Sequence, residues 1–453
     1  MLSKITDKAN YKRKKYSNLK ILFCTTFRKN KKDYHSYFTE NIKNKFKINW
    51  TLNISLGLRF LKYNLPEIEI LEYPTWSEYT EKLKQGWDIV GFSFYTRHIP
   101  NILKMVEYAR KKGIKEIWGG NYGAMNPYIE NYFDKIFTGY AEYQIANILN
   151  KKIERIKHPP LVTQWYIEPL PFRVQRVGFL FTQRGCPMKC TFCQTPVFEP
   201  NPHPLPLESI DEVLSFYKKN GVDWIGILDE NFGMLKKHTD KVIDLLGKHK
   251  IFWSVMTRAD LTLKNLDFWD QTNFIGVGIG IESMNKEVLK AWNKKMTPQT
   301  IKRLTHEMHK RNKYVWGYYI LGFENATYQD SLYEIEELLK LDIDYTQTTI
   351  LTPFPMTAQW DYLDNKFGIF EKDWSKFDTK HLVWNHPNLT KKQFDYLLKY
   401  SFYKSNNPYR TATFIKRIYK AYVDKHKSIL KGTKFVLSFP VKSYIHTNNG
   451  DFS

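Results

Sequence analysis

The sequence predicts an α/β protein with a doubly wound parallel sheet, a partial (β/α)6 barrel after it, and a helical C-terminal region. Three observations predict this class. Buried apolar strand patterns alternate with amphipathic helical patterns in two separate series. A proline-rich stretch separates the two series. The chain has 453 residues, which is more than one hydrophobic core normally organises.

The first series contains about five short apolar segments that are typical of buried strands. They lie at 19–26, 68–73, 87–95, 115–121 and 134–140. Between the third and fourth segments, residues 102–113 carry apolar side chains at helical spacing and end in Gly113, a typical helix stop. Doubly wound sheets bind ligands at the carboxyl ends of their strands. The residues at these strand ends are therefore candidates for a binding site.

The second series begins after residues 151–175, which contain four prolines and weak periodicity and are expected to form a linker. Six strand patterns separated by helical patterns follow, and they indicate a complete or partial parallel barrel. They lie at 177–183, 223–230, 251–258, 274–283, 314–323 and 345–354. The expected parts are a basic flexible tail (1–17), a first domain (18–150), the linker, a barrel (176–365) and an aromatic, basic helical region (366–453).

The chain is strongly basic, with 69 Lys and Arg against 46 Asp and Glu and a formal net charge of +23. This charge favours an anionic partner such as nucleic acid, a phosphorylated substrate or a membrane surface. The alternative is a compositional bias whose lysines form a solvated surface. No apolar run is long enough to span a membrane, and the N-terminus lacks the apolar core of a secretory signal. With only four cysteines, these features predict a cytoplasmic protein without a disulfide framework.

Three of the four cysteines, Cys186, Cys190 and Cys193, lie in one run with the spacing C-x3-C-x2-C. Three thiolates this close can bind one metal centre, and sulfur ligands favour zinc or an iron–sulfur cluster. A structural zinc site needs a fourth ligand, for which His203 is the nearby candidate. A [4Fe–4S] cluster with three cysteine ligands leaves one iron open to a substrate or cofactor. The run follows the first barrel strand, where barrel enzymes place their chemistry. The fourth cysteine, Cys24, is expected to be a small buried residue.

The cysteine run resembles the signature of the radical S-adenosylmethionine (SAM) superfamily, in which an aromatic residue, here Phe192, precedes the last cysteine. The resemblance implies that the three cysteines hold a [4Fe–4S] cluster whose open iron chelates the amino and carboxylate groups of SAM. One-electron reduction, by a donor such as flavodoxin or ferredoxin, would cleave SAM to a 5′-deoxyadenosyl radical that abstracts a hydrogen atom. Phe192 would lie beside the bound adenine.

Further motifs at the barrel strand ends are similar to the SAM-binding motifs of this superfamily. "LDENF" follows the second strand, where the family holds the SAM amino group, and "MTRAD" supplies an arginine after the third strand for the carboxylate. "GIGIES" on the fourth strand resembles the ribose and methionine motif, and "NKKMT" follows it as in many members. The resemblance implies these SAM-binding residues: Phe192, Asp229, Glu230, Asn231, Arg258, Gly280 and Glu282.

Residues 18–150 resemble the cobalamin-binding domain of the B12-dependent radical SAM group, in its cyclase- and methyltransferase-like branch. "SLGLRFL", "DIVGFSFYTR", "WGGNYGAMNP" and "TGYAEY" occur in the same order. The resemblance implies a Rossmann domain whose glycines allow close approach of the corrin. His35 is either a lower axial cobalt ligand or a surface histidine, because Phe38 replaces the glycine of the usual D-x-H-x-x-G motif. The alternative is a domain that only supports the barrel or positions the substrate. The implied cobalamin-binding residues are Ser93, Gly119, Gly120, Gly139 and Glu142.

The C-terminal region contains "DWSKFDTKHLVWNHPNLTKKQF", which resembles the segment after the barrel in the same branch. Its aromatic residues either roof a substrate pocket or pack in a core. A basic amphipathic helix is expected at 414–427, with Ile415, Ile418, Tyr419 and Tyr422 on its apolar face. This helix either packs on the barrel, which we prefer, or lies on an anionic membrane.

The favoured function is a radical SAM enzyme that methylates an unactivated carbon with the help of cobalamin. The first alternative is radical cyclisation or carbon–carbon coupling on a lipid or porphyrin-like substrate, and the second is tRNA modification. The tRNA methylthiotransferases have three further cysteines in their first domain, where this chain has only Cys24, so nucleic acid is not an expected partner. The expected partners are a small-molecule or lipid substrate and an electron donor, with peripheral membrane contact as an option. A non-catalytic zinc or iron–sulfur module is the last alternative.

Overall fold

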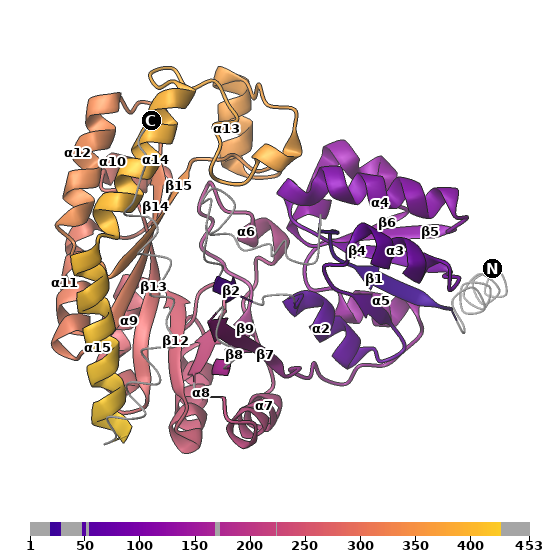
Figure 1. The fold of residues 1–453 in the computed structure, drawn as a ribbon, viewed down its shortest axis with the longest axis horizontal. Helices are drawn as coiled ribbons and strands as arrows, with labels where there is room; N and C mark the ends of the chain where they lie inside the picture. Colours follow the sequence, from indigo (N-terminus) through magenta and orange to yellow (C-terminus); the bar gives the residue numbers. More distant parts are fainter. Residues whose placement is uncertain (1–18, 29–47, 51–53, 168–172, 223, 427–453) are drawn as a thin grey trace, which may run out of the picture. The chain divides into compact units, whose positions relative to one another are not determined.

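The computed structural model describes residues 19–28, 48–50, 54–167, 173–222 and 224–426 (Figure 1). The basic tail expected at 1–17 lies outside them. The described residues divide into two compact units. The first unit takes in those within 1–35, 52–159 and 373–375, and the second takes in those within 36–51, 160–372 and 376–453.

The first unit is built on a five-stranded parallel sheet with the order β3-β1-β4-β5-β6. The strands agree with the five predicted segments, and are β1 (Ile21–Cys24), β3 (Glu69–Leu71), β4 (Ile89–Ser93), β5 (Glu116–Gly120) and β6 (Lys135–Phe137). The strand order reverses between β1 and β4, because chain connections leave these neighbours in opposite directions. This is the switch point at which doubly wound sheets bind ligands.

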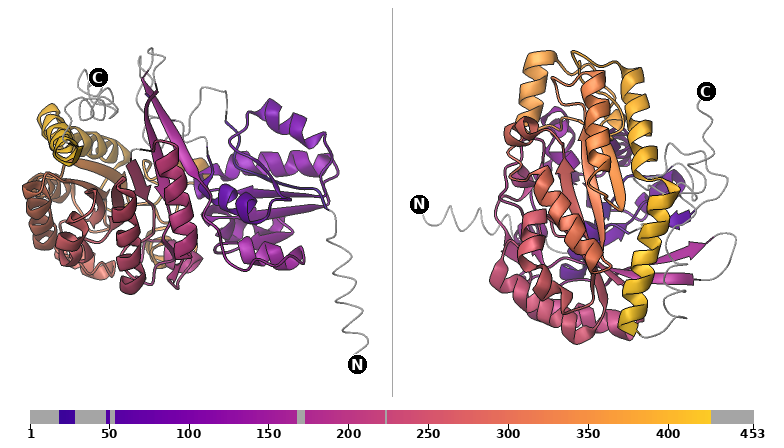
Figure 2. Two further views of the ribbon diagram at one scale, coloured as in Figure 1. Left: turned by 90° about the horizontal axis from the view of Figure 1, so that it is seen from below. Right: turned by 90° about the vertical axis from the view of Figure 1, so that its left-hand side faces the viewer.

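Helices cover both faces of this sheet (Figure 2), as a doubly wound fold requires. They are α2 (Leu56–Asn64), α3 (Trp76–Leu83), α4 (Ile99–Lys111) and α5 (Glu142–Ile148), with 3-10 turns η1 (Thr96–His98), η2 (Tyr122–Met125) and η3 (Pro127–Tyr132). Ile102 and Met105 of α4 are buried in one core with Cys24. Leu58 of α2 and Ile145 of α5 are buried in a second core. The helical spacing predicted for 102–113 is therefore confirmed.

The second unit is built on an eight-stranded sheet with the order β15-β14-β13-β12-β11-β8-β7-β2. Six neighbouring strands are parallel and follow the order of the chain, which confirms the predicted partial (β/α)6 barrel. They are β8 (Arg173–Leu180), β11 (Trp224–Ile227), β12 (Phe252–Thr257), β13 (Phe274–Glu282), β14 (Tyr314–Leu321) and β15 (Tyr345–Ile350). Their carboxyl ends all lie at one end of the barrel, where the predicted site residues follow them.

The segment 151–175 differs from the linker that its prolines suggested. It contains β7 (Leu161–Ile167) and the start of β8, and the two strands pair antiparallel. Strand β2 (Ile48–Trp50) pairs antiparallel with β7. Prolines 159 and 160 lie immediately before β7, and no proline lies within it. The barrel sheet is thus extended by two antiparallel strands.

The remaining helices of the second unit follow the barrel strands along the chain (Figures 1 and 2). They are α6 (Thr195–Phe198), α7 (Leu207–Lys219), α8 (Lys236–His249), α9 (Ala259–Asp270), α10 (Lys286–Ala291), α11 (Pro298–Lys310), α12 (Tyr328–Leu339), α13 (Ala358–Phe367), α14 (Lys391–Ser405) and α15 (Pro408–His426). Three further short elements are the antiparallel pair β9 (Gln183–Arg184) and β10 (His203–Pro204) and the 3-10 turn η4 (Trp374–Lys376), whose first two residues belong to the first unit.

Helix α14 covers strand β15 through polar contacts. The hydroxyl groups of Thr348 and Ser401 lie 2.7 Å apart. The Asn406 side chain accepts a hydrogen bond from Thr346 N and donates one to Thr346 O, both at 2.8 Å. The region after residue 366 therefore supplies the helix that packs on the last barrel strand.

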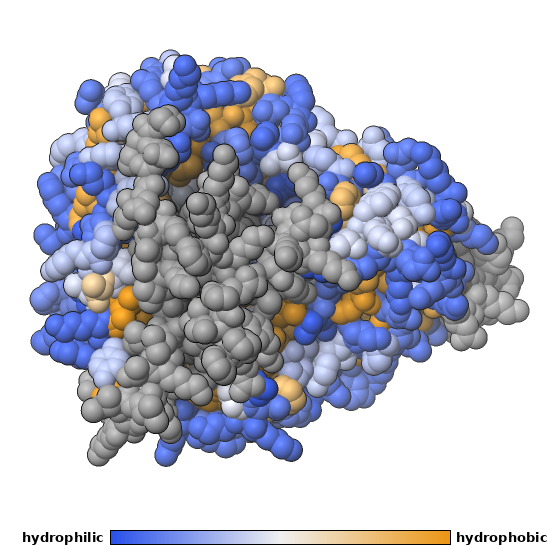
Figure 3. All heavy atoms as spheres, viewed as in Figure 1, coloured by the Kyte–Doolittle hydropathy of each residue, from blue (hydrophilic) through white to orange (hydrophobic). Residues whose placement is uncertain are grey.

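The apolar face of α15 packs on the barrel, as the sequence analysis preferred. Phe414 and Ile418 are buried in a cluster with Phe252, Ile275 and Tyr314. The side chains of Tyr422 and Lys427 lie outside the described residues. Within the part of the chain that the structure describes, no helix is both long and apolar enough to cross a membrane. The described surface in Figure 3 is mainly hydrophilic.

A buried carboxylate ties α11 and α15 to the amino-terminal ends of β14 and β15. Asp344 accepts hydrogen bonds from Val315 N at 2.8 Å, His309 Nε2 at 2.8 Å and Arg417 Nη1. His309 Nδ1 also lies 3.3 Å from Asp342 Oδ2. Burial lowers the pKa of His309, but the two carboxylates outweigh burial and Arg417, and the pKa is raised.

We expect His309 to stabilise the fold more below neutral pH than above it. An unfolded histidine has a pKa of about 6.5. Because the folded pKa is higher, the stabilisation is fully present below about pH 6.5 and is lost as the pH rises through the folded value. Denaturant titrations at about pH 6 and about pH 8.5 should show a larger loss for His309→Gln at the lower pH. His306→Gln, at an exposed position of α11, is the control. Equal losses for His309→Gln at both pH values would contradict the assignment.

Candidate active site

The loop after β8 carries the three cysteines, and its start is fixed by the backbone. Gly185 has φ +88°, and a Cβ atom there would lie 2.5 Å from the carbonyl oxygen of Asn201. Only glycine fits this turn without displacing backbone atoms. The next residue, Cys186, donates its backbone N–H to Glu199 O at 3.0 Å. The first thiol is therefore held by the returning end of its own loop.

The middle of the cysteine loop is joined to two other barrel loops. Thr191 N donates to Trp292 O at 3.3 Å, and Gln359 N donates to Thr191 O at 3.0 Å. Asn293 Nδ2 donates to Lys189 O at 3.2 Å. These bonds connect the loop to the segments after β13 and β15. The second and third thiols are therefore positioned by the barrel as well as by local turns.

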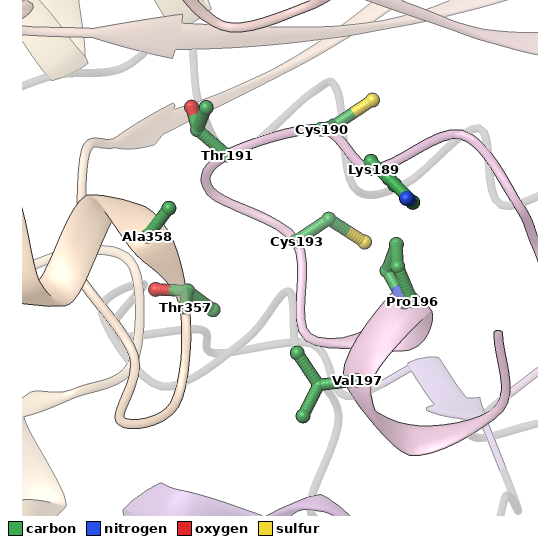
Figure 4. Close-up of a pocket in the computed structure, with 8 residues that line it drawn as sticks. All are labelled: Lys189, Cys190, Thr191, Cys193, Pro196, Val197, Thr357 and Ala358. Carbon is green, nitrogen blue, oxygen red and sulfur yellow. The ribbon is translucent and has the colours of Figure 1, made fainter.

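A cavity of about 210 Å³ lies beside the second and third cysteines (Figure 4). Both sulfur atoms point away from Thr357 and Ala358. The lining residues are Lys189, Cys190, Thr191, Cys193, Pro196, Val197, Thr357 and Ala358. Among the described residues, no three or more His, Cys, Asp or Glu side chains gather tightly enough to hold an ion.

The three thiols are close enough to influence one another electrostatically. Burial raises the pKa of Cys190 to about 11, and the thiols of Cys193 and Cys186 add to the rise while the Lys294 ammonium opposes it. Burial likewise raises the pKa of Cys186 and of Cys193. A cationic centre is therefore needed for all three to ionise. This donor set, three thiols in one loop of which two line a cavity, fits an iron–sulfur cluster.

The two acidic residues of "LDENF" accept hydrogen bonds from the start of the cysteine loop. Asp229 is fully buried and accepts hydrogen bonds from Thr182 N at 2.7 Å, Thr182 Oγ1 and Gln183 N at 3.3 Å. Glu230 Oε2 accepts from Gly185 N at 3.1 Å. Burial raises the pKa of Asp229 to about 7, and the hydrogen bonds oppose this rise. Asp229 and Glu230 therefore hold the start of the loop.

Asn231 is the member of this motif that contacts a candidate cluster ligand. It is buried, and its side chain lies close enough to the Cys186 thiol to lower the pKa of that thiol, although burial outweighs this effect and the pKa is raised. Its Oδ1 atom also accepts from Thr257 Oγ1 at 3.3 Å. Asn231 thus lies beside the first cysteine.

Arg258, implied as the SAM carboxylate partner, is engaged within the second unit. Its Nε and Nη2 atoms each donate to a carboxylate oxygen of Asp260 at 2.9 Å, and Nη2 also donates to Lys295 O at 2.7 Å. In this arrangement the guanidinium fixes the start of α9 to the loop after α10.

Gly280 and Glu282 form a compact site at the end of β13. Glu282 has φ +63°, and the pairing register between β13 and β14 shifts between these two residues. Glu282 Oε1 lies 2.7 Å from Lys294 Nζ in a nearly buried ion pair. Phe192, the aromatic residue of the signature, packs edge-on against Trp292 with ring centroids 5.4 Å apart. The motifs of β13 and of the cysteine loop are therefore neighbours.

Lys294 is the site residue that the sequence analysis did not single out. It lies in "NKKMT", which was noted as a motif without a role for any member. The sequence signal is the presence of two adjacent lysines. In the structure the side chain of Lys294 is only 12% exposed, whereas Lys295 is exposed. Sequence alone does not distinguish the two.

The implied cobalamin-binding residues separate into two groups in the first unit. Ser93 and Gly120 end the adjacent strands β4 and β5 and are half-buried, and a Cβ on Gly120 would meet nothing closer than Phe92 O at 3.9 Å. Gly119 faces inward, where a Cβ would lie 3.1 Å from the ring of Phe133.

Gly139 and Glu142 are buried, Gly139 with φ +82° and Glu142 in the first turn of α5. Asp33 and His35 lie outside the described residues. The open, Cβ-free edge at Gly120, next to the switch-point strand β4, fits the close approach of a flat corrin.

Comparisons with known proteins agree with this architecture. The family model of the radical SAM superfamily matches residues 180–353. An uncharacterized methyltransferase of Pyrococcus horikoshii is 30% identical over 230 residues, 49% of this chain and 50% of that protein. Bacteriochlorophyllide d C-8(2)-methyltransferase of Chlorobaculum tepidum is 25% identical over 334 residues, 66% of this chain and 73% of that protein. The matched region thus spans about half the length of the Pyrococcus protein.

A solved structure has a similar fold. The radical SAM methyltransferase TsrM of Kitasatospora setae, with cobalamin and a [4Fe–4S] cluster bound, aligns with a TM-score of 0.57 at 14% identity. The alignment covers 77% of this chain and 78% of that chain.

The barrel and its cysteine loop define the class of this part of the chain: residues 180–353 form a radical SAM domain. The described fold is similar to that of TsrM, whose solved structure holds cobalamin and a [4Fe–4S] cluster.

Proposed function

We propose that the protein is a cobalamin-dependent radical SAM methyltransferase. The observation that carries this proposal is the C-x3-C-x2-C loop, whose second and third cysteines line a cavity at the carboxyl end of the barrel. The relatives support methyl transfer, since the Pyrococcus and Chlorobaculum proteins are both named as methyltransferases. The doubly wound first unit supports cobalamin, which the TsrM structure holds.

In this proposal Cys186, Cys190 and Cys193 hold a [4Fe–4S] cluster, which leaves one iron for SAM. When bound, the cluster supplies the electron that cleaves SAM, and cobalamin supplies the methyl group. Asn231 lies beside the Cys186 thiol, and the Asp229 carboxylate fixes the loop that carries Cys186.

The surroundings of the reaction are also part of the proposal. All four cysteines are free thiols in the structure, which suits a reducing cytoplasm. The reaction needs a one-electron donor, such as flavodoxin or ferredoxin, and we propose a small-molecule or lipid substrate. The relative from Chlorobaculum is named for a bacteriochlorophyllide, and this makes chlorin- and porphyrin-type compounds the first substrates to assay. Contact with a membrane surface is a further proposal, motivated by the net charge of +23.

The test is anaerobic reconstitution with iron, sulfide, cobalamin and dithionite, followed by product analysis after addition of SAM. We expect 5′-deoxyadenosine and S-adenosylhomocysteine to form together in the presence of a methyl acceptor. A variant with alanine at Cys186, Cys190 and Cys193 is the control and should form neither. Deoxyadenosine without S-adenosylhomocysteine on a substrate that is consumed would exclude methyl transfer and favour cyclisation or coupling. Absence of both products and of a cluster spectrum would exclude the whole proposal.

A further inference from the structure

The ion pair of Glu282 and Lys294 is unusually constrained by the backbone of β13. Glu282 Oε1 and Lys294 Nζ are 2.7 Å apart, and their side chains are 10% and 12% exposed. The positive φ of Glu282 turns its side chain back over Gly280. A Cβ atom on Gly280 would lie 2.0 Å from Glu282 Oε1 and 2.5 Å from Lys294 Nζ. Glycine at position 280 is therefore a requirement of the pair.

The segment that carries Lys294 is bonded to the cysteine loop. Lys294 N donates to Leu289 O at 2.8 Å, which closes the turn after α10. Its neighbours Trp292 and Asn293 bind Thr191 and Lys189 of the cysteine loop through the hydrogen bonds described above. The position of Lys294 is thus coupled to the position of the cysteines.

The other side of Glu282 is held as firmly. Ser283 Oγ and Met284 N donate to Glu334 Oε2 of α12 at 3.1 Å and 3.3 Å. Tyr319 OH donates to the same oxygen at 2.8 Å. The backbone after Glu282 is therefore anchored to the outer helix, and the direction of the Glu282 carboxylate is left to Lys294.

The Lys294 ammonium interacts electrostatically with Glu282 and with Cys190. Burial lowers the pKa of Lys294, yet Glu282 outweighs burial and the pKa is raised, so the side chain is a cation. The same ammonium lowers the pKa of Cys190. A nearly buried carboxylate that lost this partner would turn toward water or take up a proton.

We propose that Lys294 is a positioning residue for SAM, which holds the Glu282 carboxylate in its binding orientation next to the cysteine loop. This inference rests on the proposed function, because Glu282 contacts SAM only in a radical SAM enzyme. Neither the sequence motifs nor the relatives assign a role to Lys294. The alternative is an ion pair that only stabilises the end of β13.

The test uses the anaerobically reconstituted holoenzyme and measures SAM affinity by equilibrium binding. We expect Lys294→Gln to weaken SAM binding by at least about tenfold, which corresponds to about 1.4 kcal/mol. Iron content should stay at the wild-type value, and the unfolding temperature should fall, because a nearly buried carboxylate loses its partner, but should stay well above the assay temperature. Lys294→Arg, which keeps the charge, should recover most of the affinity. Lys295→Gln, at the exposed neighbouring position, is the matched control and should bind SAM as the wild type does.

The spectrum of the reduced cluster supplies a second readout that does not depend on turnover. SAM should change the electron paramagnetic resonance spectrum of the wild type and of Lys295→Gln, but much less that of Lys294→Gln at the same SAM concentration. Gly280→Ala should displace the Glu282–Lys294 pair without removing its charges. It should therefore weaken SAM binding and the spectral change as Lys294→Gln does.

Two outcomes separate this inference from the proposed function. If the wild type forms the cluster and binds SAM, but Lys294→Gln and Gly280→Ala bind it as tightly as Lys295→Gln, the inference alone is overturned. If the wild type binds no cluster or no SAM, the proposed function is overturned and the inference with it.

Discussion

Replacing Cys186, Cys190 or Cys193 by alanine is expected to abolish the iron–sulfur cluster and all SAM cleavage. Three protein ligands for four irons leave no spare thiolate, so removal of one opens a second iron to solvent. The loop itself should persist, because its backbone bonds to Glu199, Trp292 and Gln359 do not involve the sulfur atoms. The measurement is iron and sulfide content after reconstitution, together with 5′-deoxyadenosine formation.

The fourth cysteine provides the matched control for this experiment. Cys24 is fully buried in β1 of the first unit, and burial raises the pKa of its thiol. Cys24→Ala should keep the full iron content and cost only the stability of a small buried side chain, about 1 kcal/mol. A cluster retained in Cys193→Ala, or lost in Cys24→Ala, would contradict the assignment of the ligands.

The second large effect is expected at Asp229. Asp229→Ala leaves the N–H groups of Thr182 and Gln183 and the hydroxyl of Thr182 without their buried acceptor. An unsatisfied buried polar group costs about 1–3 kcal/mol, so the three together should lower the free energy of unfolding by roughly 3 kcal/mol or more. The unfolding temperature should fall by roughly 6–10 °C. Cluster content should fall as well, because these groups lie at the start of the cysteine loop.

Thermal unfolding of the reconstituted protein, followed by circular dichroism and iron content, measures this effect. Asp240→Ala is the control, because Asp240 forms only an exposed ion pair with Lys236 on α8. Such a pair contributes about 0.3–0.5 kcal/mol. If Asp229→Ala were as stable as Asp240→Ala and lost only SAM affinity, Asp229 would be a direct SAM ligand, as the family resemblance implied.

The barrel and the cysteine loop could be predicted from the sequence because their signals are local. Six apolar segments with turn residues at their ends predict six parallel strands, and the spacing of three cysteines predicts a shared centre. Strand β7 was missed because the two prolines directly before it suggested a longer irregular segment.

The partners of the charged site residues could not be predicted, because they depend on contacts between distant segments. Asp229 meets residues 182 and 183 only after the first two barrel strands pair. Lys294 meets Glu282 only because the chain takes a positive φ at position 282 and a glycine leaves room at 280. Arg258, which the resemblance implies as a partner of the SAM carboxylate, also binds Asp260 two residues on, and this contact is not marked by any motif.

The network around Asp344, which stabilises the barrel, lies at the opposite end of the strands from the candidate active site. It fastens α15 at the amino-terminal ends of β14 and β15, whereas the cysteines and Glu282 lie at the carboxyl ends. Changes at Arg417 or His309 therefore alter the robustness of the barrel without touching the reacting groups. The C-terminal helix can therefore be varied to change stability without altering the end of the barrel that carries the cysteines.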